Sequence, residues 1–325
     1  MAADRTRDAQ RATGTPTTPP RALDRPPPGD LGLIALAAAM VSTSGALIRQ
    51  ATRGRGAPTM AIAMWRNAFA ALVMIPVALV TRRDELRKLE RRDWLLCMAS
   101  GLVLAGHFAT WVPSISYTKV SSATALVAIQ PVWAALIARS RGDNIARRGW
   151  LGIVVAVIGA AALSGVDFGV SARAVWGDIL AIVGGVLAGA YVTMGGSIRQ
   201  RVSTTVYTAI CYTTAAVILL AVCVAAGQPL TGYDANAWLA IGALTVGAQL
   251  LGHTVFNHVL KTTSPTFVSL AILFDVVGSV VLAGIFFNEW PSLAAIPAAG
   301  IIVTGIVLVV RAGTQPEVSG VPVME

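Results

Sequence analysis

The chain has few charged residues for its length. Asp, Glu, Lys and Arg make up only 13% of its 325 residues, whereas 55% are hydrophobic and the mean hydropathy is +0.68. A water-soluble protein of this size needs far more charge on its surface. The composition therefore predicts an integral membrane protein that has the lipid bilayer around it.

Cysteine is scarce as well, and the motifs of common enzymes are missing. Cys97, Cys211 and Cys223 all fall in apolar segments, without a CxxC pair or a partner at metal-ligand spacing. HExxH, GxSxG, GxGxxG and the phosphate-loop motif do not occur. We therefore expect no metal, no cofactor and no catalytic residue. Without a phosphate loop the chain cannot hydrolyse ATP by itself.

Ten apolar stretches are each long enough to cross a hydrocarbon core of about 30 Å, which takes about 20 helical residues. These runs are continuous rather than alternating, so they predict helices and not the strands of a barrel. They lie near residues 31–48, 58–81, 94–114, 120–138, 148–166, 177–197, 203–226, 238–260, 265–287 and 292–310. The predicted fold class is an all-α integral membrane protein with ten transmembrane helices.

The basic residues are distributed unequally between the two sides that such a chain would present. The net charge of +9 would suggest nucleic acid in a soluble protein, but here most of the 25 Lys and Arg residues share the side of the N-terminus. The other side holds Arg49, Arg53, Arg55, Lys119 and Arg173. We expect a cytoplasmic (inner) membrane protein with both termini in the cytoplasm and no nucleic-acid partner, although the block from Arg49 to Arg55 argues the other way.

The dipeptide Gly-His occurs twice, as Gly106-His107 and Gly252-His253, each time in the third member of a run of five apolar segments. The two halves align at an offset of about 145 residues. An odd number of crossings per repeat makes the second copy enter from the opposite side, which is the construction of many secondary transporters. The predicted organisation is a disordered tail over 1–30, repeats over 31–166 and 177–311, and a short tail over 312–325.

Four parts of the sequence share an order and spacing: the stretches GHFATWVPSISYTKVSSATALVAIQPVWAAL and GAQLLGHTVFNHVLKTTSPTFVSLAILF, Gly-Asp at 177–178, and Arg66 in MWRNAFAALVM. Together they resemble the drug/metabolite transporter superfamily, in its EamA-type branch of ten-helix carriers. The resemblance spans about residues 31–311 and implies two inverted five-helix repeats around a central cavity, with the fifth and tenth helices at the periphery. Where that family commonly has Glu-Pro in the ninth helix, this chain has Asp275-Val276, which keeps an acid and removes a kink.

Two charged residues lie within apolar segments. Asp275 is near the middle of LAILFDVVGSVVLAGIFF, where an ionised carboxylate costs several kcal/mol unless it is paired or hydrated. It predicts either an acid that couples protons or binds a substrate amine, or a structural ion pair with Arg66. Arg66 could clamp a substrate carboxylate, pair with Asp275 or snorkel to the interface, and the structural pair is favoured over contact with a substrate.

Other polar side chains follow helical spacing. Gln249, His253 and Asn257 are four residues apart, so one face of the eighth helix would carry all three. They predict either hydrogen bonds between helices, worth about 0.6–2 kcal/mol each, or a cavity wall in which His253 changes protonation.

The first repeat supplies further candidates. His107 and Trp111 share a face of the third helix, and Trp111 would be either a stacking surface for a solute or an interfacial anchor. Gln130 precedes Pro131, which either kinks the fourth helix or frees a carbonyl to line a cavity. Tyr191, from the small-residue stretch of the sixth helix, completes the set of cavity candidates.

The sequence thus predicts a secondary carrier that moves a small organic metabolite or drug-like solute by alternating access, outward by family resemblance, with protons as the natural coupling ion. Two alternatives stay open. One is a membrane enzyme that uses His107 and Asp275 as an acid/base pair on a lipid-borne group, and the other is a solute sensor or scaffold. The sequence also leaves open whether the chain forms a homo-oligomer.

Overall fold

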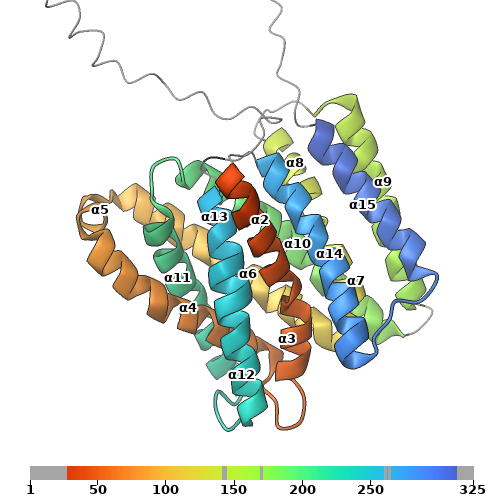
Figure 1. The fold of residues 1–325 in the computed structure, drawn as a ribbon, viewed down its shortest axis with the longest axis horizontal. Helices are drawn as coiled ribbons and strands as arrows, with labels where there is room; N and C mark the ends of the chain where they lie inside the picture. The colour runs from red at the N-terminus through yellow and green to blue at the C-terminus, as the bar shows by residue number, and fades with distance from the viewer. Residues whose placement is uncertain (1–27, 141–144, 169–170, 260–261, 263–264, 313–325) are drawn as a thin grey trace, which may run out of the picture.

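A computed structural model of the chain describes residues 28–140, 145–168, 171–259, 262 and 265–312. All regular secondary structure in these ranges is helical (Figure 1). The predicted all-α class is therefore confirmed. The predicted tails fall almost entirely on residues 1–27 and 313–325, which lie outside the described residues.

The helices follow the apolar segments. In the first half they are α2 Pro28–Ser42, α3 Ser44–Ala51, α4 Thr59–Thr81, α5 Arg83–Lys88, α6 Arg91–Tyr117, α7 Val120–Val127, α8 Gln130–Ser140 and α9 Arg147–Phe168. In the second half they are α10 Ala172–Ile198, α11 Thr204–Ala225, α12 Ala235–Leu244, the π-helix η1 Thr245–His253, α13 Thr254–Val259, α14 Pro265–Phe287 and α15 Ala295–Ala312.

Three predicted segments contain a break or a change of helix type. The first is divided at Thr43 into α2 and α3, the fourth before Gln130 into α7 and α8, and the eighth contains η1. Among the described residues, seven helices or joined helices are long and apolar enough to cross a membrane. Large apolar side chains such as Val80, Leu239 and Phe286 are exposed on the outside of the bundle. This combination is typical of a multi-pass membrane protein.

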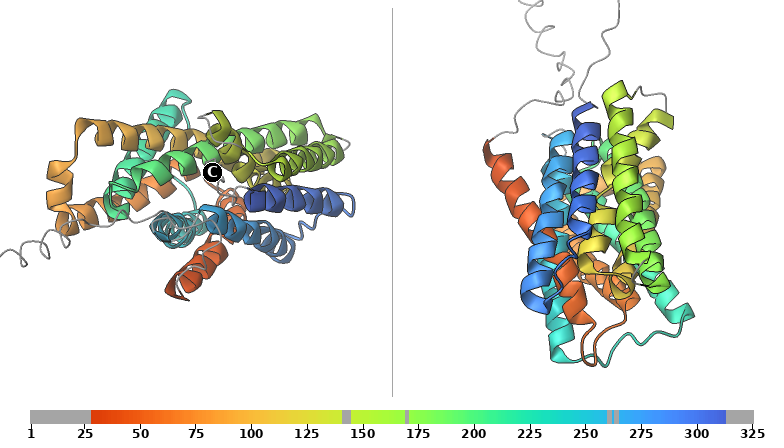
Figure 2. Two further views of the ribbon diagram at one scale, coloured as in Figure 1. Left: turned by 90° about the horizontal axis from the view of Figure 1, so that it is seen from above. Right: turned by 90° about the vertical axis from the view of Figure 1, so that its right-hand side faces the viewer.

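The helices form a flattened bundle with a pair at each edge (Figures 1 and 2). α4 and α11 pack together at one edge, and α9 and α15 form the opposite edge, as the resemblance implies for the fifth and tenth helices. α9 and α15 approach through small residues, because a Cβ on Gly152 would lie 2.6 Å from Val309 N and one on Gly305 would lie 2.7 Å from Gly152 O.

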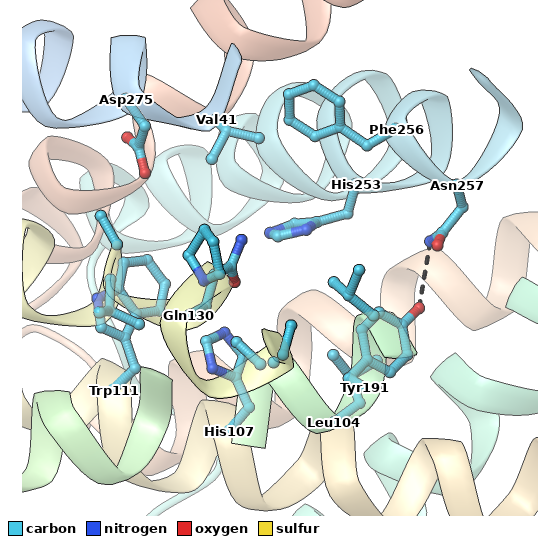
Figure 3. A pocket seen from close by; sticks show the side chains of 17 residues that line it. Val41, Leu104, His107, Trp111, Gln130, Tyr191, His253, Phe256, Asn257 and Asp275 are labelled. Carbon is cyan, nitrogen blue, oxygen red and sulfur yellow. Dashed lines mark hydrogen bonds between the residues drawn. The ribbon is translucent and has the colours of Figure 1, made fainter. Parts of the chain in front are cut away.

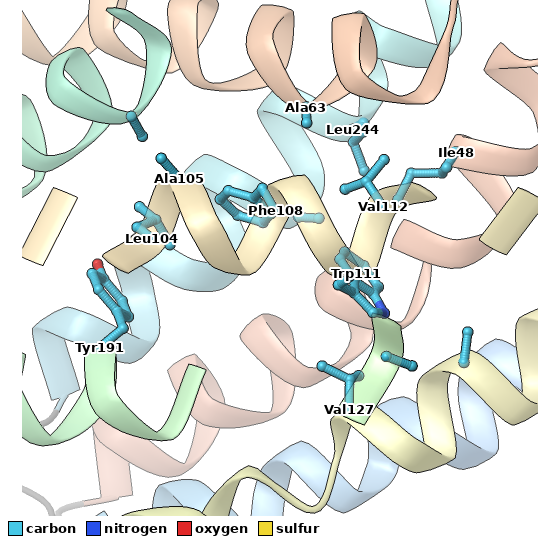
Figure 4. Packing of buried hydrophobic residues seen from close by; sticks show 14 of the residues in the cluster. Ile48, Ala63, Leu104, Ala105, Phe108, Trp111, Val112, Val127, Tyr191 and Leu244 are labelled. Carbon is cyan, nitrogen blue, oxygen red and sulfur yellow. The ribbon is translucent and has the colours of Figure 1, made fainter. Parts of the chain in front are cut away.

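The middle of the bundle is organised around α6, whose opposite faces meet different helices (Figure 4). Phe108 and Val112 point toward Ala63 of α4 and Leu244 of α12, while Leu104 and Trp111 point toward α10 and α7. Small residues of α10 let its neighbours approach closely. A Cβ on Gly184 would lie 3.0 Å from Trp111 Cβ, and one on Gly189 would lie 2.8 Å from Gln130 O.

The two described chain ends lie at the same end of the bundle. The N-terminal end of α2 and the C-terminal end of α15 are both at the top of Figure 1 and of the right-hand view in Figure 2. The opposite end holds the C-terminal ends of α3 and α14.

Candidate functional site

A cavity of about 90 Å³ lies at the centre of the bundle (Figure 3). With about 10–15 Å³ needed for each water molecule, it has room for several waters or one small solute. Its wall is mostly apolar with a few polar groups, the usual character of a small-molecule site. The lining residues come from α2, α6, α7, α8, α10, η1, α13 and α14.

Seven of the predicted site residues line this cavity. They are His107, Trp111, Gln130, Tyr191, His253, Asn257 and Asp275. The sequence distributes them over two halves of the chain, and the structure brings them together around one space (Figure 3). Arg66 and Gln249 are not among the lining residues.

The imidazole of His107 is held in one orientation. Its Nδ1 is 2.9 Å from the carbonyl oxygen of Gly184 in α10. Because a carbonyl only accepts, Nδ1 carries the proton, and Nε2 is left for another partner. The ring is parallel to that of Trp111, with 5.8 Å between centroids and 7° between planes. The close approach of α10, which only small residues allow, therefore fixes a flat wall for the cavity.

Trp111 is buried in the cavity wall. Its side chain is 4% exposed, and its Nε1 has no hydrogen-bond partner among the described residues. Its flat ring is available to the cavity, and the stacking role for a solute stays a prediction.

His253 and Asn257 reach the cavity from the opposite side to His107 (Figure 3). The His253 ring is edge-on to Phe108 at 6.1 Å between centroids. Asn257 Nδ2 donates to the Tyr191 hydroxyl at 3.1 Å, which joins α13 to α10 beside the cavity.

Gln249 makes hydrogen bonds between helices, one of its two predicted alternatives, and is not part of the cavity wall. Its side chain turns to α4, where its Oε1 accepts from Arg66 Nε at 2.9 Å and its Nε2 donates to Asn67 Oδ1 at 3.2 Å. The prediction from the sequence assumed a regular α-helix throughout the eighth segment, but the backbone hydrogen bonds of η1 join residues that are five apart. Spacing by four therefore no longer aligns the three side chains.

The predicted ion pair between Arg66 and Asp275 is not formed, although both residues are described. Arg66 is fully buried, and its guanidinium lies 4.2 Å from the centre of the Phe108 ring while it donates to Gln249. Asp275 is 7% exposed, and its Oδ1 accepts from Ser279 Oγ at 2.9 Å, one turn along α14. The acid belongs to the cavity wall and the arginine to the α4–η1–α6 interface, so the two charges serve different parts of the molecule.

The break before Gln130 opens the wall of the cavity. Val127, Ala128, Gln130 and Pro131 all line it. Pro131 cannot donate a backbone hydrogen bond, and the chain turns out of helix at Ala128 and Ile129 before α8 begins. Irregular backbone at this depth is tolerated where it faces a cavity or protein. Of the two interpretations of Pro131, the cavity-lining one describes the structure.

The end of the bundle opposite the termini is tied together by charged contacts. Arg49 of α3 meets the Glu289 carboxylate through two nitrogens, Nε at 3.1 Å and Nη2 at 3.3 Å, and Nη2 also donates to Thr118 O at 3.3 Å. Nearby, Arg53 lies 5.4 Å from the centre of the Phe287 ring. These contacts connect the first half of the chain to the second just after α14.

Sequence reasoning missed the apolar part of the wall. Val41 of α2 and Phe256 of α13 line the cavity, as do Ala188 and Gly189 of α10. No polar side chain drew attention to Val41 or Phe256. Their contribution depends on how α2 and α13 pack, with Val41 and Phe256 in one buried cluster.

Comparisons with known proteins bear on both the fold and the duplication. No curated protein matches the chain. A solved crystal structure, titled only as that of a protein, resembles the fold with a TM-score of 0.63 and 20% sequence identity, over 87% of this chain and 98% of the other. The EamA-like transporter family matches twice, over residues 29–165 and again over 175–311. The chain is therefore a member of the EamA-like transporter family, within the drug/metabolite transporter superfamily, and contains two copies of the family's repeat.

Proposed function

We propose that this transporter is a secondary carrier of a small, amphipathic organic solute, which binds in the central cavity. The observation that carries the proposal is the cavity itself. It joins residues of both repeats and combines a flat aromatic surface, His107 against Trp111, with one carboxylate, Asp275. A mostly apolar wall with a few fixed polar groups suits a solute that has both an apolar part and a polar group.

Ten spans in two inverted repeats are part of the proposal. It is supported by helices that follow all ten apolar segments and by the start of α2 and the end of α15, which lie at the same end of the bundle. With an even number of crossings both termini share a side, and the distribution of Lys and Arg favours the cytoplasm for that side.

Alternating access would move the two repeats against each other around the cavity. The Arg49–Glu289 pair supports this, since it joins the repeats at the end away from the termini and would have to break for the cavity to open there. Outward transport is supported by the family resemblance alone.

Protons are the proposed coupling ion, with Asp275 and His253 changing protonation as the cavity changes sides. Both side chains line the cavity, and Asp275 accepts a hydrogen bond from Ser279 within α14. A solute and a proton could therefore affect each other's binding within one space.

The test begins with a thermal-shift screen of the purified protein against amino acids, nucleosides and sugar derivatives. A stabilising compound is then used for flux in proteoliposomes with and without a pH gradient. Flux should respond to the gradient in the natural protein and lose that response in Asp275→Asn, while Asp84→Asn, at an exposed acid of α5, serves as the matched control.

Two results would count against the proposal in different ways. Flux that ignores the pH gradient and is unchanged in Asp275→Asn would remove proton coupling and leave the carrier. Chemical conversion of a bound compound without any flux would instead favour the alternative of a membrane enzyme acting through His107 and Asp275.

A further inference from the structure

The π-helix η1 occupies the middle of the span that supplies His253 and Asn257 to the cavity. Its C-terminal bond joins Thr254 N to Gln249 O, across five residues instead of four. A π turn is an α turn with one residue added, so it rotates everything beyond it by about 100° relative to an uninterrupted α-helix. The wide turn therefore decides which side chains after it point at the cavity.

Two neighbouring helices hold this turn in place at Gln249 and Thr254. The Gln249 side chain accepts from Arg66 and donates to Asn67, both in α4. The Thr254 hydroxyl donates to Gln249 O at 3.1 Å and lies 2.9 Å from the Tyr212 hydroxyl of α11. Both ends of the wide turn are thus bonded to groups outside their own helix.

Arg66 is the unusual member of this arrangement. It is fully buried, and among the residues that the structure describes its partners are an amide oxygen and the face of Phe108, with no carboxylate. Burying a cation in a membrane protein costs free energy, which points to a contact at Arg66 that a neutral side chain would make less strongly. A charged donor makes a stronger hydrogen bond to the Gln249 amide than a neutral one would.

We propose that Arg66 is a positioning residue, which holds the wide turn of η1 through Gln249 and so keeps His253 and Asn257 facing the cavity. Without this hold the turn would relax to an ordinary α turn. Each later residue would then move to the place now taken by its successor, and His253 would take the place of Thr254, against α11. The importance of this for transport rests on the proposed function, but the geometry can be tested without a solute.

The test measures how fast a cysteine at position 253 reacts with a small, hydrophilic methanethiosulfonate reagent in membranes. The background has Cys97, Cys211 and Cys223 replaced by alanine. His253→Cys is the reporter, and Val192→Cys, which lines the cavity from α10, is its matched control. We expect Arg66→Met to slow modification at position 253 by about tenfold or more, since a charged hydrogen bond is lost, and to leave position 192 unchanged.

Deletion of Leu251 supplies the rescue. Leu251 is 40% exposed within η1, and removing one residue lets the turn close as an α turn with His253 where it is now. Modification at position 253 should therefore recover in Arg66→Met with Leu251 deleted. Deletion of His258, an exposed residue of α13 beyond position 253, leaves the register before it unchanged and should not restore modification.

These rates decide whether Arg66 positions His253, separately from whether the protein is a carrier. Unchanged reactivity at position 253 in a folded Arg66→Met variant, or no recovery on deletion of Leu251, would overturn the proposal. If Arg66→Met does not fold, Arg66→Met with Gln249→Leu removes both partners together, which buried sites tolerate better, and the same rates are measured there. A protein that shows the expected rates but moves no solute would refute the carrier function and keep the positioning role.

Discussion

The ion pair between Arg49 and Glu289 offers the most direct test of movement between the repeats. It joins α3 of the first repeat to the segment after α14 of the second, with N–O distances of 3.1 and 3.3 Å. Glu289→Gln removes the charge and keeps the shape of the side chain. The conformation that lacks this contact, with the bundle open at the end away from the termini, should become more populated.

The size of the effect follows from the burial of the pair. Exposed pairs contribute about 0.2–1 kcal/mol, and a hydrogen bond to a charged group about 1.5–3 kcal/mol. Arg49 and Glu289 are 23% and 26% exposed, and Thr118 O adds a third contact. A value of about 1–2 kcal/mol lies between these limits, and it corresponds to a change of about 5–30-fold in the ratio of the two conformations.

The assay is a distance distribution between two spin labels at that end, on Arg55→Cys after α3 and on Leu293→Cys, which is 87% exposed. A longer-distance population should grow in Glu289→Gln. Arg49→Lys keeps the charge but loses the planar guanidinium, so its longer-distance population should lie between those of the natural protein and of Glu289→Gln. Asp93→Asn removes the Arg201–Asp93 pair at the other end, 2.8 Å in length, and should not lengthen this distance. An unchanged distribution in a folded Glu289→Gln protein would refute the reasoning.

Two further changes test packing and the polar contact beside the cavity by thermal melting of the purified protein. Gly305→Ala places a Cβ 2.7 Å from Gly152 O and should destabilise the α9–α15 pair by about 1–3 kcal/mol. Gly300→Ala on the same helix meets nothing within 4 Å and should be neutral. Equal melting temperatures of the two variants would contradict the packing. Tyr191→Phe leaves the buried Asn257 amide without its acceptor and should cost about 1–3 kcal/mol. Tyr233→Phe, which removes an exposed bond to Pro229 O, should change stability by less than about 0.5 kcal/mol, so similar losses in both would count against the Tyr191–Asn257 contact.

Much of the candidate site could be predicted because polar residues in apolar helices are rare and conspicuous. His107, Asn257 and Asp275 stood out for that reason, and all three line one cavity. The prediction was wrong where it assigned a partner, as with Arg66 and Asp275. Two opposite charges in apolar segments suggest a pair, but α4 presents Arg66 to η1 and α6, whereas Asp275 faces the cavity from α14.

The eighth segment shows a second limit. Spacing by four placed Gln249, His253 and Asn257 on one face, which assumes an α-helix throughout. The wide turn of η1 is stabilised by contacts from α4 and α11, such as those of Arg66 and Tyr212, which are far away in the sequence. A local sequence pattern contains no information about contacts with residues far away in the sequence.

The sequence by itself determined that this is a helical membrane protein with a duplicated half, because hydropathy and run length are local properties that the bilayer tests segment by segment. Only the tertiary structure decided which helix faces surround the cavity, which partner each buried polar group has, and where the eighth span widens. These features depend on how the helices are rotated and how closely they approach, which small residues such as Gly184, Gly189 and Gly252 allow. A rotation by one residue step, about 100°, is enough to give a side chain a different partner.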